Sequence, residues 1–504
     1  MRLRRLPMQS FSGDWSEVSQ RAWAARCEAV GVPGAHPASD EHRAAWNSLC
    51  YQLLYMGRGV LVVVRGGRVA LFACLHNTAY QAPWAALRGP AGADPVAYCQ
   101  GAQRRVPPHR RVEIRPDPRS WSLNGPLLDN WVPPKAWGVD DGRVRGMHAV
   151  VTAAARHLAP QRTVEFMLNP RDHPQLRCNL HSPHACGDDP GRTPAWREAA
   201  VPSVDGLVEL LPVLSQYTSD DFLDIPVPPV RAWQEAAAPL ARLAAPRLPR
   251  AVFRGSATGG VDNQRIALAR ALRRCPLADV KITGQSTRFR VDSTRVIHAP
   301  PALEPCIRGA PLTMDEQCEF AWAFYVEGNA GADRLPALLA RRFVVIVLAS
   351  RAPALVWLRD GTLRPHVHYV PCPSVEEAET VLAWCQGHPG DCERIAEAGH
   401  AAWMSHMSRE AIEEQYARAM NAPLPPPAPR ACARPQKKRP RGENHRGDER
   451  GRSAAGGRGL SLAPRGARRA GGLGAACQRR PRHLRRDGRG GRDFGHAGEG
   501  GGRR

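Results

Sequence analysis

The chain has 504 residues, of which 43% are hydrophobic, and it carries a formal net charge of +23. This length and composition fit a globular protein of at least two domains and exclude a small disulfide scaffold. The charge is uneven, because 22 of the 70 Lys and Arg but only 6 of the 47 Asp and Glu lie from Asn421 onward. The Gly-, Arg- and Pro-rich composition of residues 421–504 predicts a disordered tail.

No run of the sequence approaches the ~18 consecutive apolar residues of a membrane-spanning helix. The basic string MRLRRLPMQSF is followed by polar residues and not by the apolar core of a secretory signal. The fourteen cysteines show no paired C-x-x-C spacing. We therefore expect a cytoplasmic protein with free thiols and no membrane span.

The predicted elements of the amino-terminal part lead to one carboxylate. Two β-rich runs around a Gly-Gly turn predict a hairpin within residues 59–72, followed by a helix over 148–158 and a strand over 164–168. Asp172 follows that strand in the string NPRDHP. A carboxylate at a strand's carboxyl end, on proline-stiffened backbone, suits a general base, but it also suits the cap of a turn. Asp224, in a capped loop entry, is the next candidate for the base.

Two groups of potential metal ligands do not lead us to predict a metal. One group of Cys and His is spaced more tightly than in zinc fingers and lies in a Pro- and Gly-rich stretch; it consists of Cys178, His181, His184 and Cys186. His366 and His368 share a face in an extended chain, but no carboxylate or Cys ligand lies nearby in sequence. A structural role is expected for this pair.

The most informative stretch is 251–272, AVFRGSATGGVDNQRIALARAL. Its apolar start predicts the end of a buried strand, residues 254–260 predict a glycine-rich loop, and the leucine spacing predicts an amphipathic helix from about Asn263. Such a loop brings backbone N–H groups to an anion, and Arg254 and Arg265 add charged donors. The pattern indicates either a phosphate cradle or a plain strand-to-helix turn. It is not a Walker loop, because no Gly-Lys-Ser/Thr follows the glycines.

Residues 324–335, FYVEGNAGADRL, repeat this strand-loop-helix pattern. In an open parallel sheet two such segments face one ligand beyond the carboxyl ends of the strands, which favours a nucleotide site. A strand over 277–283 followed by a loop with Arg288 and Arg290, a helix over 313–320 and an apolar strand over 343–348 complete an alternating pattern. Helices are expected from Ser374 through Trp384 and over 391–420. The alternation predicts an α/β protein.

Taken together, these strings resemble glycosyltransferase family 90, the group of capsule-associated and protein O-glucosyltransferases. The matching strings are FMLNPRDHPQL, FLDIPVPP, FRGSATGG with Arg265, TMDEQCEF leading into YVEGNAGADRL, and RPHVHYVP followed by a helix containing Trp384. They occur in the family's order between about Phe166 and Tyr416. This sequence has Pro170 in the variable position and His173 where relatives usually have an aromatic residue.

The resemblance implies a GT-B fold of two Rossmann-like domains, with the active site between them. We expect a β-rich amino-terminal extension and part of the acceptor-side domain over residues 1–160. The rest of the acceptor-side domain, with the base, is expected over 161–245, the donor domain over 246–420 and the disordered tail over 421–504.

The activity that the resemblance implies is inverting transfer of glucose or xylose from a UDP-sugar to a hydroxyl of a protein or glycan. Asp172 is implied as the base, and the donor is implied as a co-substrate without a further cofactor. No D-x-D string is present, so arginines and not a metal are expected to neutralise the leaving UDP. The implied donor-binding residues are Arg254, Gly255, Ser256, Thr258, Arg265, Glu327, Asn329, Ala330, Gly331, Ala332, Asp333 and Arg334.

An alternative of another class remains open at this stage. In it the fold has lost activity, and the chain acts as a scaffold or binds nucleic acid through its basic tail. Weak binding of polyanions by the tail is possible in either case, because clustered Lys and Arg attract phosphates. The intact Asp172, Arg254, Arg265 and Arg334 favour the enzyme.

Overall fold

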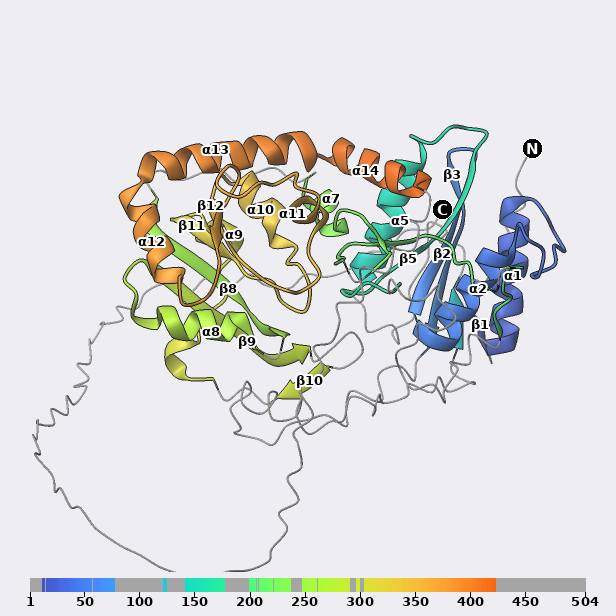
Figure 1. Cartoon of the computed structure of the whole chain (residues 1–504), viewed down its shortest axis with the longest axis horizontal. Helices are drawn as coiled ribbons and strands as arrows, with labels where there is room; N and C mark the ends of the chain where they lie inside the picture. The colour runs from blue at the N-terminus through green and yellow to red at the C-terminus, as the bar shows by residue number, and fades with distance from the viewer. Residues whose placement is uncertain are drawn as a thin grey trace, which may run out of the picture. The chain divides into compact units, whose positions relative to one another are not determined.

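The computed structural model describes residues 11–13, 15–56, 58–77, 121–124, 141–176, 199–204, 206, 208–220, 222–236, 247–260, 262–290, 296–299 and 303–422. These residues lie within one compact unit, Met1–Gln436. The Cys178 to Cys186 cluster and the basic tail lie outside the described residues, so both stay predictions. The described elements form two sheets with helices against them (Figure 1).

The first sheet has seven strands in the order β1-β4-β3-β2-β5-β6-β7. Its antiparallel pairs run from β1 to β5, and only β5, β6 and β7 pair in parallel. The predicted hairpin and the strand after it are confirmed. The strands are β1 (Phe11–Gly13), β2 (Arg58–Arg65), β3 (Arg68–Asn77), β4 (Trp121–Asn124), β5 (Thr163–Leu168), β6 (Val213–Ser215) and β7 (Ile225–Pro226).

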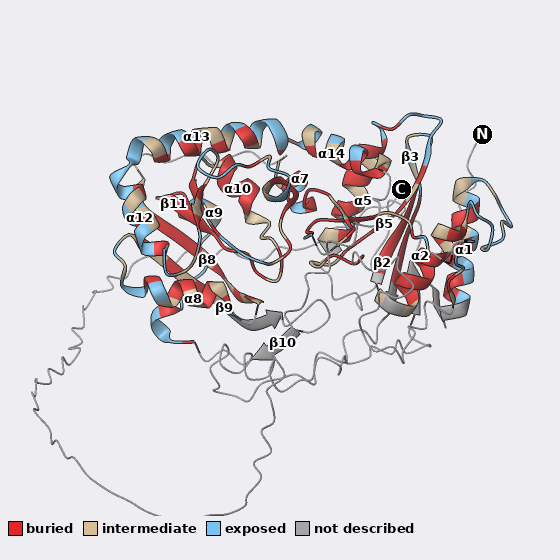
Figure 2. Cartoon of the chain, in the orientation of Figure 1, coloured by how far each residue is buried: buried red, intermediate tan, exposed pale blue. Residues whose placement is uncertain are grey.

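Strand β2 shows why this sheet is covered on both faces. Successive side chains of a strand point to opposite faces. Val62 lies in the core with α5 (Asp141–Ala155), α7 (Val230–Glu235) and α14 (Arg409–Asn421). Val63 lies in a second core with α1 (Trp15–Val30) and α2 (Arg43–Tyr51), which leads into η1 (Gln52–Met56). The uninterrupted apolar run of β2 is therefore buried between two helical layers, as its red colour shows (Figure 2).

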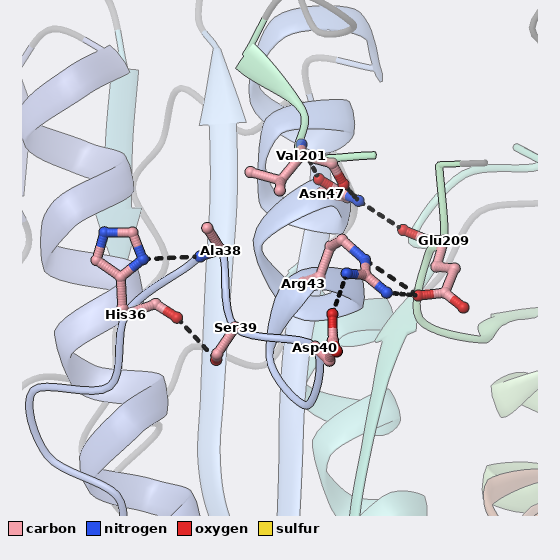
Figure 3. A network of polar contacts seen from close by, with 8 residues as sticks. All are labelled: His36, Ala38, Ser39, Asp40, Arg43, Asn47, Val201 and Glu209. Atoms are coloured by element: carbon pink, nitrogen blue, oxygen red, sulfur yellow. Dashed lines mark hydrogen bonds and ion pairs between the residues drawn. The ribbon is translucent and has the colours of Figure 1, made fainter. Parts of the chain in front are cut away.

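Helix α2 also anchors the chain that enters β6 (Figure 3). Asn47 accepts a hydrogen bond from the Val201 N–H at 2.7 Å and donates to the Glu209 carbonyl oxygen at 3.0 Å. Arg43 pairs with the carboxylates of Asp40 and Glu209 at 2.5 and 3.0 Å. These contacts place the segment that leads into the parallel part of the first sheet.

The second sheet has six strands in the order β10-β9-β8-β11-β12-β13. All its pairs are parallel except the β9–β10 edge pair. The predicted α/β class is confirmed, but only this sheet has the predominantly parallel arrangement expected of a Rossmann-like domain. The strands are β8 (Leu248–Gly260), β9 (Ala278–Arg290), β10 (Val296–Ala299), β11 (Phe320–Tyr325), β12 (Val344–Leu348) and β13 (Val370–Cys372).

The helices of the second half lie around this sheet, and the last one returns to the first. The Trp233 indole donates to the Glu413 carboxylate of α14 at 2.9 Å, and the Tyr416 hydroxyl donates to the Pro228 carbonyl at 2.9 Å. Helix α13 is exposed along one side (Figure 2). The remaining helices are α8 (Gln264–Ala271), η4 (Leu272–Arg274), η5 (Pro305–Ile307), α9 (Met314–Gln317), α10 (Arg334–Ala340), α11 (Val356–Arg359), α12 (Ala378–Gly387) and α13 (Pro389–His406).

Three local predictions are wrong. Residues 254–260 are strand and not loop, because β9 continues beside them and pairs Thr258 with Arg288 and Gly260 with Arg290 past a bulge. For the same reason Arg288 and Arg290 belong to β9 and not to a loop. The helix from Met314 ends at Gln317, although Thr313 caps it as expected, because Phe320 already begins the buried strand β11. In these segments, pairing with the adjacent strands outweighs the local conformational preference of the apolar and small residues.

Candidate functional site

The loop after β5 holds Asp172 in a dense network of hydrogen bonds. The Asn169 amide donates to the His173 carbonyl at 2.7 Å and to the Ser215 hydroxyl at 2.9 Å. Its oxygen accepts from the Arg171 N–H and from the Gln175 side chain, both at 3.0 Å. Asn169 therefore closes the turn that presents Asp172 beyond the strand.

Asp224 fixes the far end of the same loop. Its buried carboxylate accepts from the N–H groups of Gln175 and Leu176, both at 2.6 Å, and from the Ser215 hydroxyl at 2.5 Å. Burial raises the pKa of Asp224 to about 6, while these hydrogen bonds act in the opposite direction. A carboxylate that is enclosed and engaged by three donors holds backbone in place, so its geometry suits an anchor better than a base.

The Asp172 carboxylate itself is accessible, with 45% of the side chain exposed. Its Oδ1 lies 2.5 Å from Nη1 of Arg143, which comes from α5. Arg143 Nη2 in turn lies 3.9 Å from Oδ2 of Asp333, at the entrance of α10 beside the second sheet. Arg143 thus lies between the carboxylate of Asp172, which follows a strand of the first sheet, and that of Asp333, which lies beside the second sheet.

The carboxyl ends of β8 and β11 meet around Arg265. This buried side chain donates from Nη1 to the Ser256 carbonyl at 3.1 Å and to the Thr258 hydroxyl at 2.9 Å. Nε and Nη2 donate to the Val326 carbonyl at 3.2 and 3.0 Å. A Cβ on Gly328 would lie 2.9 Å from Thr258 Oγ1 and 3.0 Å from Arg265 Nη2, so glycine is needed where the two segments approach. The structure brings together the two segments that the sequence paired.

Glu327 and Asn329 are buried polar groups within the second segment. Burial raises the pKa of Glu327 to about 7, although a hydrogen bond with Ser350 and the charge of Arg265 lower it. The side-chain oxygen of Asn329 is buried and has no hydrogen-bond partner among the described residues. Such an oxygen is costly to enclose without a hydrogen-bond partner.

The backbone from Ala330 to Asp333 is fixed by neighbouring groups. The Ala330 carbonyl accepts from the Gly328 N–H at 2.9 Å, and the Gly331 N–H donates to the Pro353 carbonyl at 2.7 Å. The Ala332 N–H donates to the Tyr325 hydroxyl at 2.9 Å. Asp333 accepts a hydrogen bond from the Tyr217 hydroxyl, which comes from the first half of the chain. The segment therefore has a defined path before α10 begins.

Arg334 contacts an aromatic ring and forms no ion pair within the described residues. Its guanidinium lies over the Phe253 ring, 5.0 Å from the centroid, and 3.4 Å from where a Cβ on Gly255 would stand. Within the part of the chain that the structure describes, no carboxylate forms an ion pair with it. Burial, and then the charge of Arg231, lower the pKa of Arg334 to about 10. A mostly enclosed cation in this state favours an incoming anion.

Arg254 and Arg265 are engaged differently. Arg254 donates to the Asp279 carboxylate and to the Asp279 carbonyl, both at 2.7 Å. Arg265 uses all three nitrogens on protein oxygens, and burial, followed by the charge of Arg334, lowers its pKa to about 10. Direct contact of Arg254, Arg265 and Arg334 with a diphosphate stays a prediction.

The described residues contain no group of three or more His, Cys, Asp or Glu that is suited to a metal ion. His366 adopts a left-handed conformation with φ of 59°, and His368 Nδ1 accepts the Arg364 N–H at 3.0 Å. These two histidines therefore shape a turn before β13. No helix of the described residues is long and apolar enough to cross a membrane. The nine described cysteines form no disulfide.

Sequence reasoning missed Arg143 and Tyr217. Arg143 lies 29 residues from Asp172 in the sequence, a separation that carries no local signal. Tyr217 reaches Asp333 across 116 residues. Asn169, by contrast, stood in the quoted NPRDHP string, and its position three residues before Asp172 was the available clue.

The fold and the site define an α/β protein in which Arg143 pairs with Asp172 after a strand of the first sheet and lies 3.9 Å from Asp333, before α10. The family model of glycosyl transferase family 90 matches residues 210–422. This part of the chain, a little over two fifths of its length, is similar to that family, as the motifs predicted.

Two curated proteins are similar to parts of this chain. The uncharacterized protein 027R of Frog virus 3 (isolate Goorha) is 29% identical over 417 residues, which cover 73% of this chain and 41% of that protein. The O-glucosyltransferase rumi homolog of Aedes aegypti is 25% identical over 275 residues, 50% of this chain and 58% of that protein. The chain thus spans about half the length of these relatives.

Among solved structures, Anabaena HepE in complex with UDP-glucose overlaps with 34% of this chain and 48% of its own. The identity is 11% and the TM-score is 0.25. A score this low supports no argument about fold or ligand.

Proposed function

We propose that the chain is an inverting, metal-independent glycosyltransferase that moves glucose or xylose from a UDP-sugar to an acceptor hydroxyl of a protein or glycan. The observation that carries the proposal is Arg334, an enclosed cation without a carboxylate partner among the described residues, at the edge where β8 and β11 end. The family match over residues 210–422 supports it.

The diphosphate of the donor supplies the counter-ion that Arg334 lacks. Charge-assisted hydrogen bonds between guanidinium and phosphate are stronger than neutral ones, and they are well suited to a planar fork. Gly255 and Gly328 allow the backbone to approach Arg334 and Arg265 closely, and Ser256, Thr258 and Asn329 offer polar groups to the nucleotide. Arg254 and Arg265 add positive potential behind them.

Asp172 acts as the general base. It takes the proton of the acceptor hydroxyl while that oxygen forms a bond to the anomeric carbon, and the bond from this carbon to the phosphate oxygen breaks. UDP leaves with its new negative charge next to Arg334. A single displacement of this kind inverts the anomeric centre, and the arginines stabilise the charge that develops on the leaving group.

The test combines binding with turnover. A ligand at a hundred times its dissociation constant stabilises the folded state by about 2.7 kcal/mol, so UDP should raise the melting temperature clearly. Incubation with UDP-glucose or UDP-xylose and a panel of protein and glycan acceptors, followed by mass detection, should then reveal a transferred sugar or hydrolysed donor. The absence of both UDP stabilisation and donor turnover would leave the scaffold alternative in place.

A further inference from the structure

Arg143 occupies a bridging position between two carboxylates that come from different halves of the chain. Its Nη1 lies 2.5 Å from Asp172 Oδ1, and its Nη2 lies 3.9 Å from Asp333 Oδ2. Only 23% of the Arg143 side chain is exposed. Asp333 is 20% exposed, and it is also held by the Tyr217 hydroxyl. Arg143 and Asp333 are therefore the more enclosed members of these contacts, whereas 45% of the Asp172 side chain is exposed.

The electrostatics of this cluster keep Arg143 charged. Burial lowers the pKa of Arg143, but the charges of Asp172 and Asp333 outweigh burial and raise it above its ordinary value. The cluster also raises the pKa of Asp333, where burial is the main cause and Asp172 adds to it. The charged and titratable groups that act on the cluster from the surrounding elements are Tyr217 after β6, Arg231 on α7, Asp333 before α10 and Tyr416 on α14.

We propose that Arg143 is a positioning residue for the reaction. It aims the Asp172 carboxylate, keeps it ionised, and ties it to the segment that ends in Arg334. The inference rests on the proposed function, in which Asp172 is the base and Arg334 binds the diphosphate. It adds that Arg143, which itself does not contact the substrate, sets the orientation of the Asp172 carboxylate and keeps this group negatively charged.

Two substitutions should act on Asp172 in opposite directions. A cation within ~4–6 Å favours the ionised carboxylate, whereas a nearby anion disfavours it. Arg143→Met removes the cation, so Asp172 should protonate at higher pH. Asp333→Asn removes an anion but keeps an acceptor for Tyr217, so Asp172 should protonate at lower pH. General damage to the fold cannot produce shifts of opposite sign.

The experiment measures kcat/KM for UDP-sugar turnover against pH, together with the Kd for UDP, in the full chain. Arg143→Met should move the acid limb upward by about one pH unit and lower kcat by roughly 10-fold or more, while the Kd for UDP stays within about twofold. Asp333→Asn should move the limb downward. Arg143→Lys should restore part of the shift. Arg145→Met, an exposed arginine of the same helix, is the matched control and should leave the profile unchanged.

The inference would be overturned if the acid limb of the kcat/KM profile were the same in Arg143→Met and Asp333→Asn as in the wild type. It would also be overturned if Arg145→Met shifted this limb as much as Arg143→Met does. If Arg143→Met does not fold, the Asp333→Asn profile decides alone. Failure of the proposed function is distinguishable, because it appears as a wild-type protein that neither binds UDP nor turns over a UDP-sugar, or as an Asp172→Asn variant with full activity.

Discussion

The two sheet edges that form the candidate site differ in how completely their polar groups are satisfied. At the edge of the first sheet, Asn169 and Asp224 each engage several backbone and side-chain groups of the loop that carries Asp172. At the edge of the second sheet, Arg334 has no carboxylate partner and the Asn329 oxygen has no hydrogen-bond partner among the described residues. The loop that carries Asp172 is thus fixed by its own hydrogen bonds, whereas under the proposed function the donor engages Arg334 and Asn329.

This difference assigns different work to the two edges. The proposed base must be held in one direction before the acceptor arrives, and the end of β5, the turn closed by Asn169 and the anchor Asp224 hold the Asp172 loop in place. In the proposed diphosphate site, Arg334 supplies positive charge that no carboxylate of the described residues pairs with, and the anion compensates this charge when it binds. Single substitutions at either edge test this division of roles.

The largest effect is expected at Asp172. Asp172→Asn keeps the shape of the side chain but cannot accept a proton, and general-base catalysis is worth about 10²–10⁴-fold, so kcat should fall by about that factor. Binding of UDP belongs to the other edge and should stay within roughly twofold. Steady-state kinetics and UDP titration of the same preparation measure both.

The control for this variant is Asp220→Asn, because Asp220 is fully accessible and pairs with Arg359 at 3.1 Å. It should leave kcat unchanged. A joint loss of UDP binding and turnover in Asp172→Asn would mean that Asp172 is a structural cap, which is the other interpretation that the sequence left open.

The next effect is expected at Arg334. Arg334→Ala should weaken UDP binding by about 1.5–3 kcal/mol, the usual worth of a hydrogen bond to a charged group, with the fold retained. Arg254→Ala should weaken it less, because the Arg254 guanidinium is already paired with Asp279. Calorimetric titration with UDP gives both values. The reverse order, with Arg254 dominant, would move the diphosphate toward β9.

The sequence predicted the residues of both edges better than it predicted their geometry. Apolar runs and glycines revealed β5, β11 and the turn at Gly66-Gly67, whose positive φ values of 63° and 69° require this residue type. Family strings pointed to Asp172 and Arg334. The strand character of residues 254–260 was missed, because the partner strand that pairs with them lies outside any local window. Arg143 was missed for the same physical reason, since only tertiary contact gives it a role.

A smaller effect is expected when the anchor of the base loop is altered. In Asp224→Asn the side-chain NH2 group replaces the carboxylate oxygen that accepts the Leu176 N–H, so this hydrogen bond is lost. A buried donor without a partner costs about 1–3 kcal/mol. Ser215→Ala removes one hydroxyl donor to the same carboxylate and should cost less. Urea unfolding midpoints measure the loss. If Asp224→Asn abolished turnover without loss of stability, Asp224 and not Asp172 would be the base.

The smallest effect that we expect is the pH dependence of the unfolding free energy that Glu327 causes at the edge of the second sheet. Burial raises the pKa of Glu327 from 4.5 to about 7 in the folded protein. The folded state then binds a proton that the unfolded state has lost, so the contribution of Glu327 to stability is fully present below pH 4.5 and is lost as the pH rises through 7. Between pH 6 and pH 8 the loss amounts to about 1 kcal/mol, since one pKa unit corresponds to about 1.4 kcal/mol.

Glu327→Gln tests this directly, because the amide keeps a polar group next to Ser350 but does not titrate. Its unfolding free energy should fall less than that of the wild type from pH 6 to pH 8, and the difference between the two proteins isolates Glu327 from Asp224, which also titrates near pH 6. UDP should alter the difference, because a bound diphosphate adds negative charge near Glu327 and favours its protonated form. Parallel pH curves for the two proteins would show that Glu327 is already ionised at pH 6, with Arg265 as the counter-ion of its carboxylate. The edge of the second sheet would then have less uncompensated positive charge than Arg334 and Arg265 imply.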